Sequence, residues 1–108
     1  MKIIQNRFLP FKGFKAITIL NMIFVRKGTV LDAVELNHEN IHWQQEKEML
    51  IVGFYLWYVI EFILHFIKCG NAKKAYYRIS FECEAYDNEM NLDYISERKH
   101  FAWLKLCR

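Results

Sequence analysis

The residues with the clearest chemical potential are two histidines and a glutamate in the segment HENIH at positions 38–42. On a helix, His38 and His42 stand one turn apart on the same face, so one metal ion can bind both imidazoles. Glu39 lies beside that position rather than on it, where a carboxylate can accept a proton from a metal-bound water. The HExxH pattern therefore predicts a zinc site with His38 and His42 as ligands and Glu39 as a general base. The alternative is a polar helix face that carries two histidines by chance.

The metal hypothesis requires a helix, and the sequence predicts one from Leu31 to Leu50. This stretch contains neither Pro nor Gly, and its apolar residues recur at helical spacing. Asp32 is suited to the N-cap, and Glu35 three residues later completes a capping box. The local sequence thus favours the geometry that the two histidines need.

A catalytic zinc also needs a third protein ligand, and Glu82 and Glu84 are the candidates. Glu82 shares its helix face with apolar or small residues, whereas the face of Glu84 is polar and is expected to be solvated. A carboxylate on an apolar face must be paired or metal-bound. Glu82 is therefore the predicted ligand, and a Glu82–Arg78 ion pair at helical spacing is the alternative.

These two motifs, HENIH and the later Glu82-x-x-Ala85, resemble those of the gluzincins, zinc metallopeptidases with a His-His-Glu ligand set. The pattern is most similar to that of the CAAX-prenyl and heat-shock endopeptidases and the β-lactam-sensor peptidases. The chain also looks like a group of small bacterial zincin-like proteins. Tyr86 stands where the larger families usually carry Asp, which puts the surroundings of the ligands in doubt.

The resemblance implies a zincin-like fold and zinc as the cofactor. It also implies a substrate-binding edge strand near Met22–Val25, with an edge that merely covers the helices as the alternative. A further donor to the developing oxyanion is expected, and Tyr86, Tyr76 and Tyr77 are equal candidates for it.

The length and composition of the chain limit what kind of protein it can be. The 108 residues are expected to form a single domain over 1–108, and 54% are hydrophobic and 17% aromatic. The net charge of +3 is not gathered into a stripe, so nucleic acid is not an expected partner. Three cysteines without C-x-x-C spacing favour free thiols, with Cys83 in the protein interior, and the N-terminus is too polar for a signal peptide. We therefore expect a cytoplasmic protein.

An apolar run over 49–67 is long enough to raise the question of a membrane. A single crossing would separate His42 from Glu82 by about 30 Å of hydrocarbon, so a shared metal excludes it. We expect a core helix instead, with contact to a membrane surface and oligomer formation left open. The chain must then reverse near residues 49–54, with Gly53 as the expected pivot. Glu61 and His65 within the run form either an ion pair or a second metal site.

The remaining segments complete a predicted α+β fold that is mainly α, with three to four helices. Lys15–Lys27 predicts one bent strand or two short ones around Asn21, after a turn at Pro10 and Gly13. Gly70 is suited to cap a helix, the next helix begins near Asn71, and Tyr94–Leu106 predicts a terminal amphipathic helix.

Two functions follow from the sequence. The first is a zinc-dependent metallopeptidase, a hydrolase acting on peptide or protein substrates. The second is an inactive zincin-like module that binds partners in a complex or at a membrane surface. An intact Glu39 favours the first, because a purely structural zinc site needs no general base.

Overall fold

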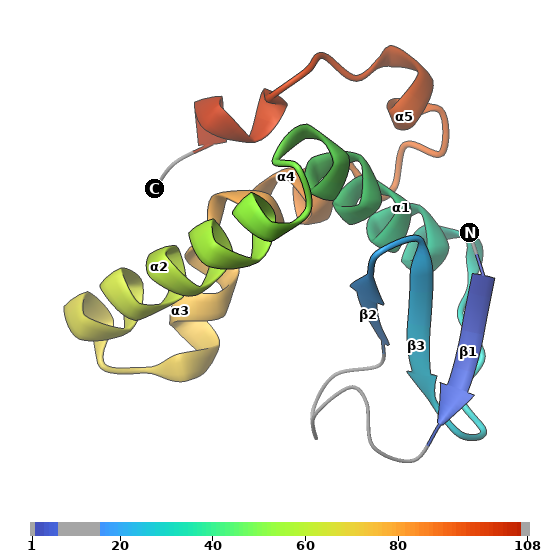
Figure 1. Ribbon diagram of the computed structural model, residues 1–108, viewed down its shortest axis with the longest axis horizontal. Helices are drawn as coiled ribbons and strands as arrows, with labels where there is room; N and C mark the ends of the chain where they lie inside the picture. Colours follow the sequence, from blue (N-terminus) through green and yellow to red (C-terminus); the bar gives the residue numbers. More distant parts are fainter. Residues whose placement is uncertain (1, 7–15, 107–108) are drawn as a thin grey trace.

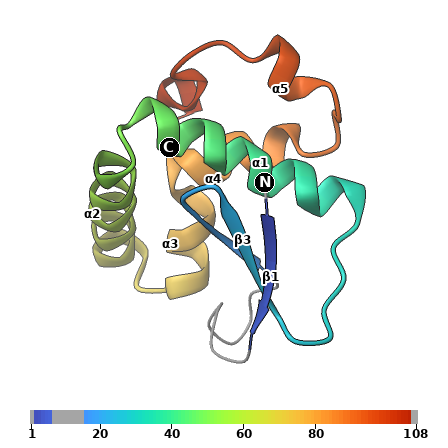
Figure 2. The same ribbon diagram turned by 45° about the vertical axis from the view of Figure 1, so that its right-hand side comes forward.

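The computed structural model describes residues 2–6 and 16–106, and in that part of the chain it shows a mainly helical α+β fold with a small N-terminal sheet (Figure 1). The elements are β1 Lys2–Asn6, β2 Ala16–Ile19, β3 Met22–Arg26, α1 Ala33–Glu48, α2 Val52–Cys69, α3 Ala72–Arg78, α4 Ser80–Asn88, α5 Tyr94–Glu97 and the 3-10 helix η1 Ala102–Leu106. Helix α1 runs across one end of the sheet and contacts β2 and α4 (Figure 2). The predicted fold class is confirmed.

The sheet is a β2–β3 hairpin to which β1 adds in parallel, in the order β1-β3-β2. Two short strands meet at a turn over Leu20 and Asn21, which is one of the two forms predicted there. Strand β1 was not predicted. Because β1 pairs with β3, the residues Met22–Val25 lie in the central strand with hydrogen bonds on both sides. The prediction that they form an edge strand is wrong, and the strand beside α1 is β2.

Helix α1 begins as predicted. The Asp32 carboxylate accepts from the Glu35 amide at 2.8 Å, and the Glu35 carboxylate accepts from the Asp32 amide at 3.0 Å. This capping box satisfies two of the amides that a helix start leaves unpaired.

The chain reverses between α1 and α2, within the predicted interval but at other residues. Leu50 and Ile51 both have positive φ angles, 55° and 64°. Gly53, the expected pivot, lies inside α2 instead. Left-handed backbone costs roughly 1 kcal/mol or more for a residue with a side chain. The tight reversal thus rests on two strained residues rather than on a glycine.

The return path is a broken helix. Gly70 ends α2 in the left-handed conformation and α3 begins next to Asn71, both as predicted. The Asn71 side chain caps α3, which was not predicted. The helix is then interrupted at Ile79, which is extended, and restarts at Ser80. The Glu61 carboxylate of α2 accepts hydrogen bonds from the Ser80 amide and hydroxyl, so it caps the start of α4.

The C-terminal segment does not form the predicted continuous helix over Tyr94–Leu106. It forms α5 and η1, separated by Arg98 in an extended conformation. Arg98 leaves the helix to bind carboxylates of α1 and α4, and Trp103 then packs into the core beside Phe81 and Phe54. The predicted turn at Pro10 and Gly13, and Cys107, lie outside the described residues.

Candidate metal centre

The buried side of α1 is polar. Of its buried residues only Ile41 is apolar, and the others are Asn37, His38, Glu39, His42, Gln45 and Glu46. Burying polar side chains costs free energy unless each finds a partner. Such a departure from ordinary packing is typical of a functional site.

Three of the buried side chains meet at one point. His38 and His42 of α1 and Glu82 of α4 offer ligand atoms that all lie within 4.8 Å of one another. The His38 Nε2–Glu82 Oε1 distance is 3.2 Å, His42 Nε2–Glu82 Oε1 is 3.0 Å, and the two Nε2 atoms are 3.2 Å apart. Two ligands of a tetrahedral zinc with bonds near 2.05 Å are separated by about 3.3 Å. The group therefore has the spacing of one metal's ligand set.

The orientation of His42 also suits a ligand. Its Nδ1 lies 2.8 Å from Gln45 Oε1, and Gln45 Nε2 donates to the Phe81 carbonyl at 3.0 Å and to Glu84 Oε1 at 2.9 Å. Since the amide nitrogen of Gln45 is used as a donor, its oxygen must accept from His42 Nδ1–H. The lone pair of neutral His42 is then on Nε2, the atom that faces His38 and Glu82.

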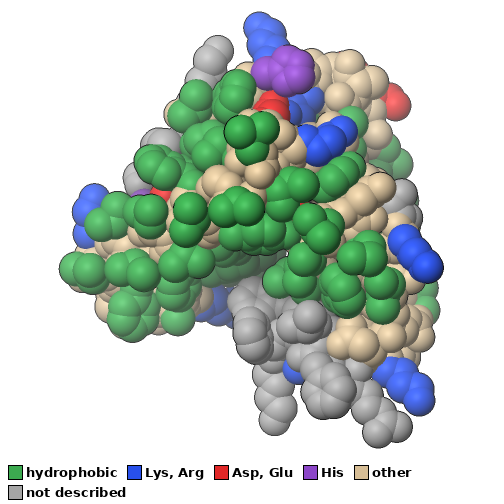
Figure 3. Space-filling view, in the orientation of Figure 1, with side chains coloured by type: hydrophobic (Ala, Val, Ile, Leu, Met, Phe, Trp, Pro, Cys, Tyr) green, Lys and Arg blue, Asp and Glu red, His purple; other side chains and the backbone are tan. Residues whose placement is uncertain are grey.

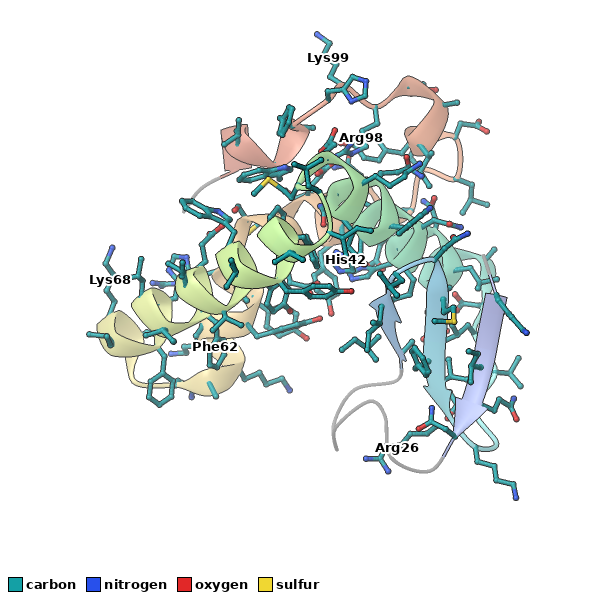
Figure 4. The ribbon with its side chains drawn as sticks, in the orientation of Figure 1. Arg26, His42, Phe62, Lys68, Arg98 and Lys99 are labelled. Atoms are coloured by element: carbon teal, nitrogen blue, oxygen red, sulfur yellow. The ribbon has the colours of Figure 1, made fainter. Side chains whose placement is uncertain are left out.

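Glu82 is fixed at its second oxygen. Tyr58 of α2 donates to Glu82 Oε2 at 2.7 Å, while Oε1 faces the two histidines. The structure thus contradicts the alternative in which Glu82 pairs with Arg78. Figure 4 shows His42 pointing from α1 toward the helices that bring these partners.

His42 and Glu82 each stabilise the charged form of the other. Burial would lower the pKa of His42, but the Glu82 carboxylate beside it raises that pKa to about 10, with smaller effects from Glu39 and Gln45. Burial would raise the pKa of Glu82, but His42 and the hydrogen bonds from both histidines hold it well below the usual range of a carboxyl. A metal ion that binds these atoms competes with the proton of His42.

Glu39 is buried next to the group, and β2 holds it in place. The Thr18 hydroxyl lies 2.8 Å from Glu39 Oε1 and 3.2 Å from the Glu39 carbonyl oxygen. The charge of Glu39 is one of the smaller causes that raise the pKa of His42 and of Tyr58. Glu39 is thus a positioned carboxylate beside the three candidate ligands rather than one of them.

Glu84, expected to be solvated, is completely buried. It accepts hydrogen bonds from Arg98 Nε at 2.5 Å and Nη2 at 2.9 Å, from the Tyr94 hydroxyl at 2.7 Å and from Gln45. Arg98 also binds both oxygens of Glu48, at 2.7 and 2.9 Å. The prediction was wrong because the segment that covers Glu84 comes from the C-terminal end of the chain. Glu84 contributes to the site by fixing the side chain of Gln45, which donates to it.

Of the candidate oxyanion donors, Tyr86 contacts the ring of His38. Its ring centroid is 4.4 Å from that of His38, and its hydroxyl lies 3.0 Å from the hydroxyl of Tyr76. Tyr77 contacts the Tyr86 ring. Burial raises the pKa of Tyr86 and of Tyr76, so both phenols keep their protons at neutral pH and can donate.

The Glu61–His65 pair has the geometry of an ion pair, with Nε2 and Oε1 3.7 Å apart. Glu61 is also used to cap α4. Within residues 2–6 and 16–106, the His38, His42 and Glu82 group is the one found to be suited to a metal. Cys83 is buried, as predicted, with its sulfur 3.3 Å from the Tyr77 carbonyl oxygen.

Three residues that support the site were not foreseen: Gln45, Tyr58 and Thr18. Gln45 follows His42 by three residues, so helical spacing could have identified it. Tyr58 and Thr18 approach from α2 and β2, and the sequence near the motif carries no signal for either.

No family model, curated protein or solved structure matches the chain. A functional assignment therefore rests on the chemistry of the site. A His-His-Glu set suits zinc and is also compatible with other divalent transition metals.

Proposed function

We propose that the chain is a zinc-dependent peptidase that hydrolyses peptide bonds in peptide or protein substrates, with His38, His42 and Glu82 as the metal ligands. The observation that carries the proposal is the tetrahedral spacing of these three ligand atoms with the buried Glu39 carboxylate beside them. The same arrangement is what the resemblance to gluzincins implies. Three protein ligands rather than four are typical of catalytic zinc, because a position must stay open for water.

Each side chain then has a defined task. Bound zinc supplies a Lewis acid that brings the pKa of a water molecule near neutrality and polarises a carbonyl group. Glu39 accepts the proton of the attacking water and returns it to the leaving amine. Thr18 fixes one oxygen of Glu39 for this transfer. Tyr86 donates a hydrogen bond to the substrate carbonyl oxygen as negative charge develops there.

The test is the substitution Glu39→Gln, which keeps the size of the side chain but removes the base. We expect the variant to bind zinc as the wild type does and to lose at least about 100-fold in the rate of hydrolysis of an unfolded casein substrate. Glu97→Gln, on an exposed residue of α5, is the matched control and should keep full activity. Hydrolysis by Glu39→Gln at the wild-type rate would show that Glu39 is not the base.

A second candidate is an inactive zincin-like module that acts by binding. The observation in its favour is the wide exposed apolar surface of α2. The two functions differ in one measurement: the module binds zinc at one equivalent per chain yet cleaves no member of a broad peptide library.

A further inference from the structure

Helix α2 has its apolar side turned outward. Its exposed residues are apolar except for one lysine, namely Val52, Leu56, Trp57, Val59, Ile60, Ile63, Leu64, Phe66, Ile67 and Lys68. At 100° per residue, the apolar ones cover roughly half of the helix circumference. Figure 3 shows hydrophobic side chains running along this arm of the molecule. We call this set, from Val52 to Ile67, the α2 face.

The opposite side of α2 holds the ionisable groups. Glu61 and His65 are buried against α3 and α4, where Glu61 binds Ser80. A helix with a carboxylate and an imidazole on its buried side and an almost wholly apolar exposed side is the reverse of a helix in water, and this is the arrangement of a helix that faces lipid. By length and composition alone, Val52–Cys69 could also cross a membrane.

Basic residues accompany the α2 face, and the α2–α3 hairpin itself has no exposed acidic residue. Lys68, Lys73, Lys74 and Arg78 are all exposed, near the outer end of α2 and along α3. Figure 4 shows Lys68 at the outer end of the arm. Between residues 52 and 78 the one acidic side chain is Glu61, which is buried. The α2–α3 hairpin therefore presents an apolar face together with a net positive charge of its own.

From these observations we infer that the α2 face docks in the plane of an anionic lipid bilayer, with Lys68, Lys73 and Lys74 at the level of the headgroups. An apolar helix face buried at the acyl boundary, supported by lysines that contact anionic lipids, is the usual physical basis of peripheral membrane binding. The docking does not depend on the metal site or on peptidase activity.

The path of the chain argues against a helix that crosses the bilayer. Helix α3 runs back beside α2 and carries exposed Lys74 and Arg78. If α2 stood across the membrane, about 27 Å long, these charges and the start of α4 would be drawn into the hydrocarbon. With α2 lying in the plane, α3 and α4 stay on the aqueous side.

Charge also argues against a second copy of the chain as the occupant. A second copy would bring the same basic residues and no exposed carboxylate from its own hairpin to pair with them. A bilayer rich in anionic lipid neutralises them and covers the apolar face at the same time.

The test is partition of the full-length, zinc-loaded protein onto vesicles. We expect binding to vesicles of phosphatidylcholine with phosphatidylserine at 3:1, and at least about 10-fold weaker binding to phosphatidylcholine alone. High salt should weaken the anionic binding because it screens the lysines. Equal partition onto both vesicles, or none onto either, would overturn the docking.

Two sets of substitutions test the surface itself. Replacing Lys68, Lys73 and Lys74 by Gln should weaken anionic binding on the order of 100-fold, at roughly fivefold for each charge. The control is Lys27→Gln with Lys99→Gln, exposed lysines outside the hairpin, which should bind like the wild type. Unchanged binding after loss of the three lysines would contradict the proposed orientation.

The apolar set is Ile60→Ser, Ile63→Ser and Ile67→Ser, at the centre of the α2 face. These residues are exposed, so the circular dichroism spectrum should not change, while vesicle binding should be lost. The control is Val30→Ser with Leu92→Ser, exposed apolar residues elsewhere. Two other results would overturn the proposal. One is a lipid-free dimer, seen by sedimentation equilibrium, that the isoleucine variant abolishes, because the α2 face would then bind a second copy. The other is protein that stays with the vesicles after alkaline carbonate extraction, because α2 would then cross the bilayer.

Discussion

Gln45 is predicted to set the metal affinity of the site without touching the metal. It is completely buried, accepts from His42 Nδ1 at 2.8 Å and donates to the Phe81 carbonyl and to Glu84. The substitution Gln45→Met keeps the length of the side chain and removes all three hydrogen bonds. His42 then loses the acceptor that fixes its tautomer and ring orientation.

Loss of such a partner typically lowers metal affinity 10- to 100-fold, which is about 1.4 to 2.8 kcal/mol. The loss of affinity also appears as a smaller stabilisation of the folded protein by zinc. At a zinc concentration 100 times the wild-type dissociation constant, zinc stabilises the wild type by about 2.7 kcal/mol. The same concentration is only 1 to 10 times that of the variant, and the stabilisation falls to roughly 0.4 to 1.4 kcal/mol.

The assay is competition for zinc against a chromophoric chelator, combined with unfolding in urea with and without zinc. Gln44→Met, one residue away on α1, is the matched control and should bind zinc like the wild type. A correctly folded Gln45→Met protein with wild-type zinc affinity would refute the proposed role of Gln45, and with it the assignment of Nε2 as the ligand atom of His42.

Two further predictions concern the stability of the metal-free protein, measured in the presence of a chelator. Arg98→Met leaves the buried Glu84 without its cation and should lower the free energy of unfolding in urea by about 3 to 5 kcal/mol. Adding Glu84→Gln to the same chain should restore most of this loss. A loss below about 1 kcal/mol in Arg98→Met would contradict the prediction. Burial raises the pKa of Glu46 from 4.5 to about 7, so the folded state holds this proton more tightly than the unfolded state does. The stability that the proton contributes is fully present below pH 4.5 and is lost as the pH rises through 7. Glu46→Gln should therefore flatten the fall in stability between pH 4.5 and 7, and an unchanged pH profile would show that Glu46 does not titrate in this range.

The parts of the structure that sequence reasoning found are those set by local geometry. The capping box of α1 and the glycine cap at Gly70 each depend on residues a few positions apart. The choice of Glu82 over Glu84 as the residue beside the histidines also followed from helix periodicity. In each case a physical rule connects near neighbours in the chain, so one sequence is enough.

The parts that were missed depend on segments that meet only in the folded chain. Thr18 reaches Glu39 across 21 residues, and Arg98 reaches Glu48 across 50. The parallel pairing of β1 moved Met22–Val25 from the edge to the centre of the sheet. No periodicity near the motif encodes these contacts, because each is a product of tertiary packing.

The reversal between α1 and α2 is a place where the local preference of glycine gave a wrong prediction. Gly53 was expected to turn the chain because glycine adopts positive φ at little cost. Leu50 and Ile51 make the turn instead, and the Ile51 amide bonds to the Glu46 carbonyl at 2.7 Å. Tertiary packing of α2 overrides the preference of single residues at this point.

The central claim is that two imidazoles of α1 and one carboxylate of α4 bind a single zinc ion. The most direct test is the metal content of the protein after equilibration with zinc and removal of the excess. We predict one zinc per chain for the wild type and for His65→Ala, a histidine as buried as the ligands, and less than a tenth of that for His38→Ala and Glu82→Gln. A folded wild type without zinc, or full zinc content in Glu82→Gln, would contradict the assignment of the site.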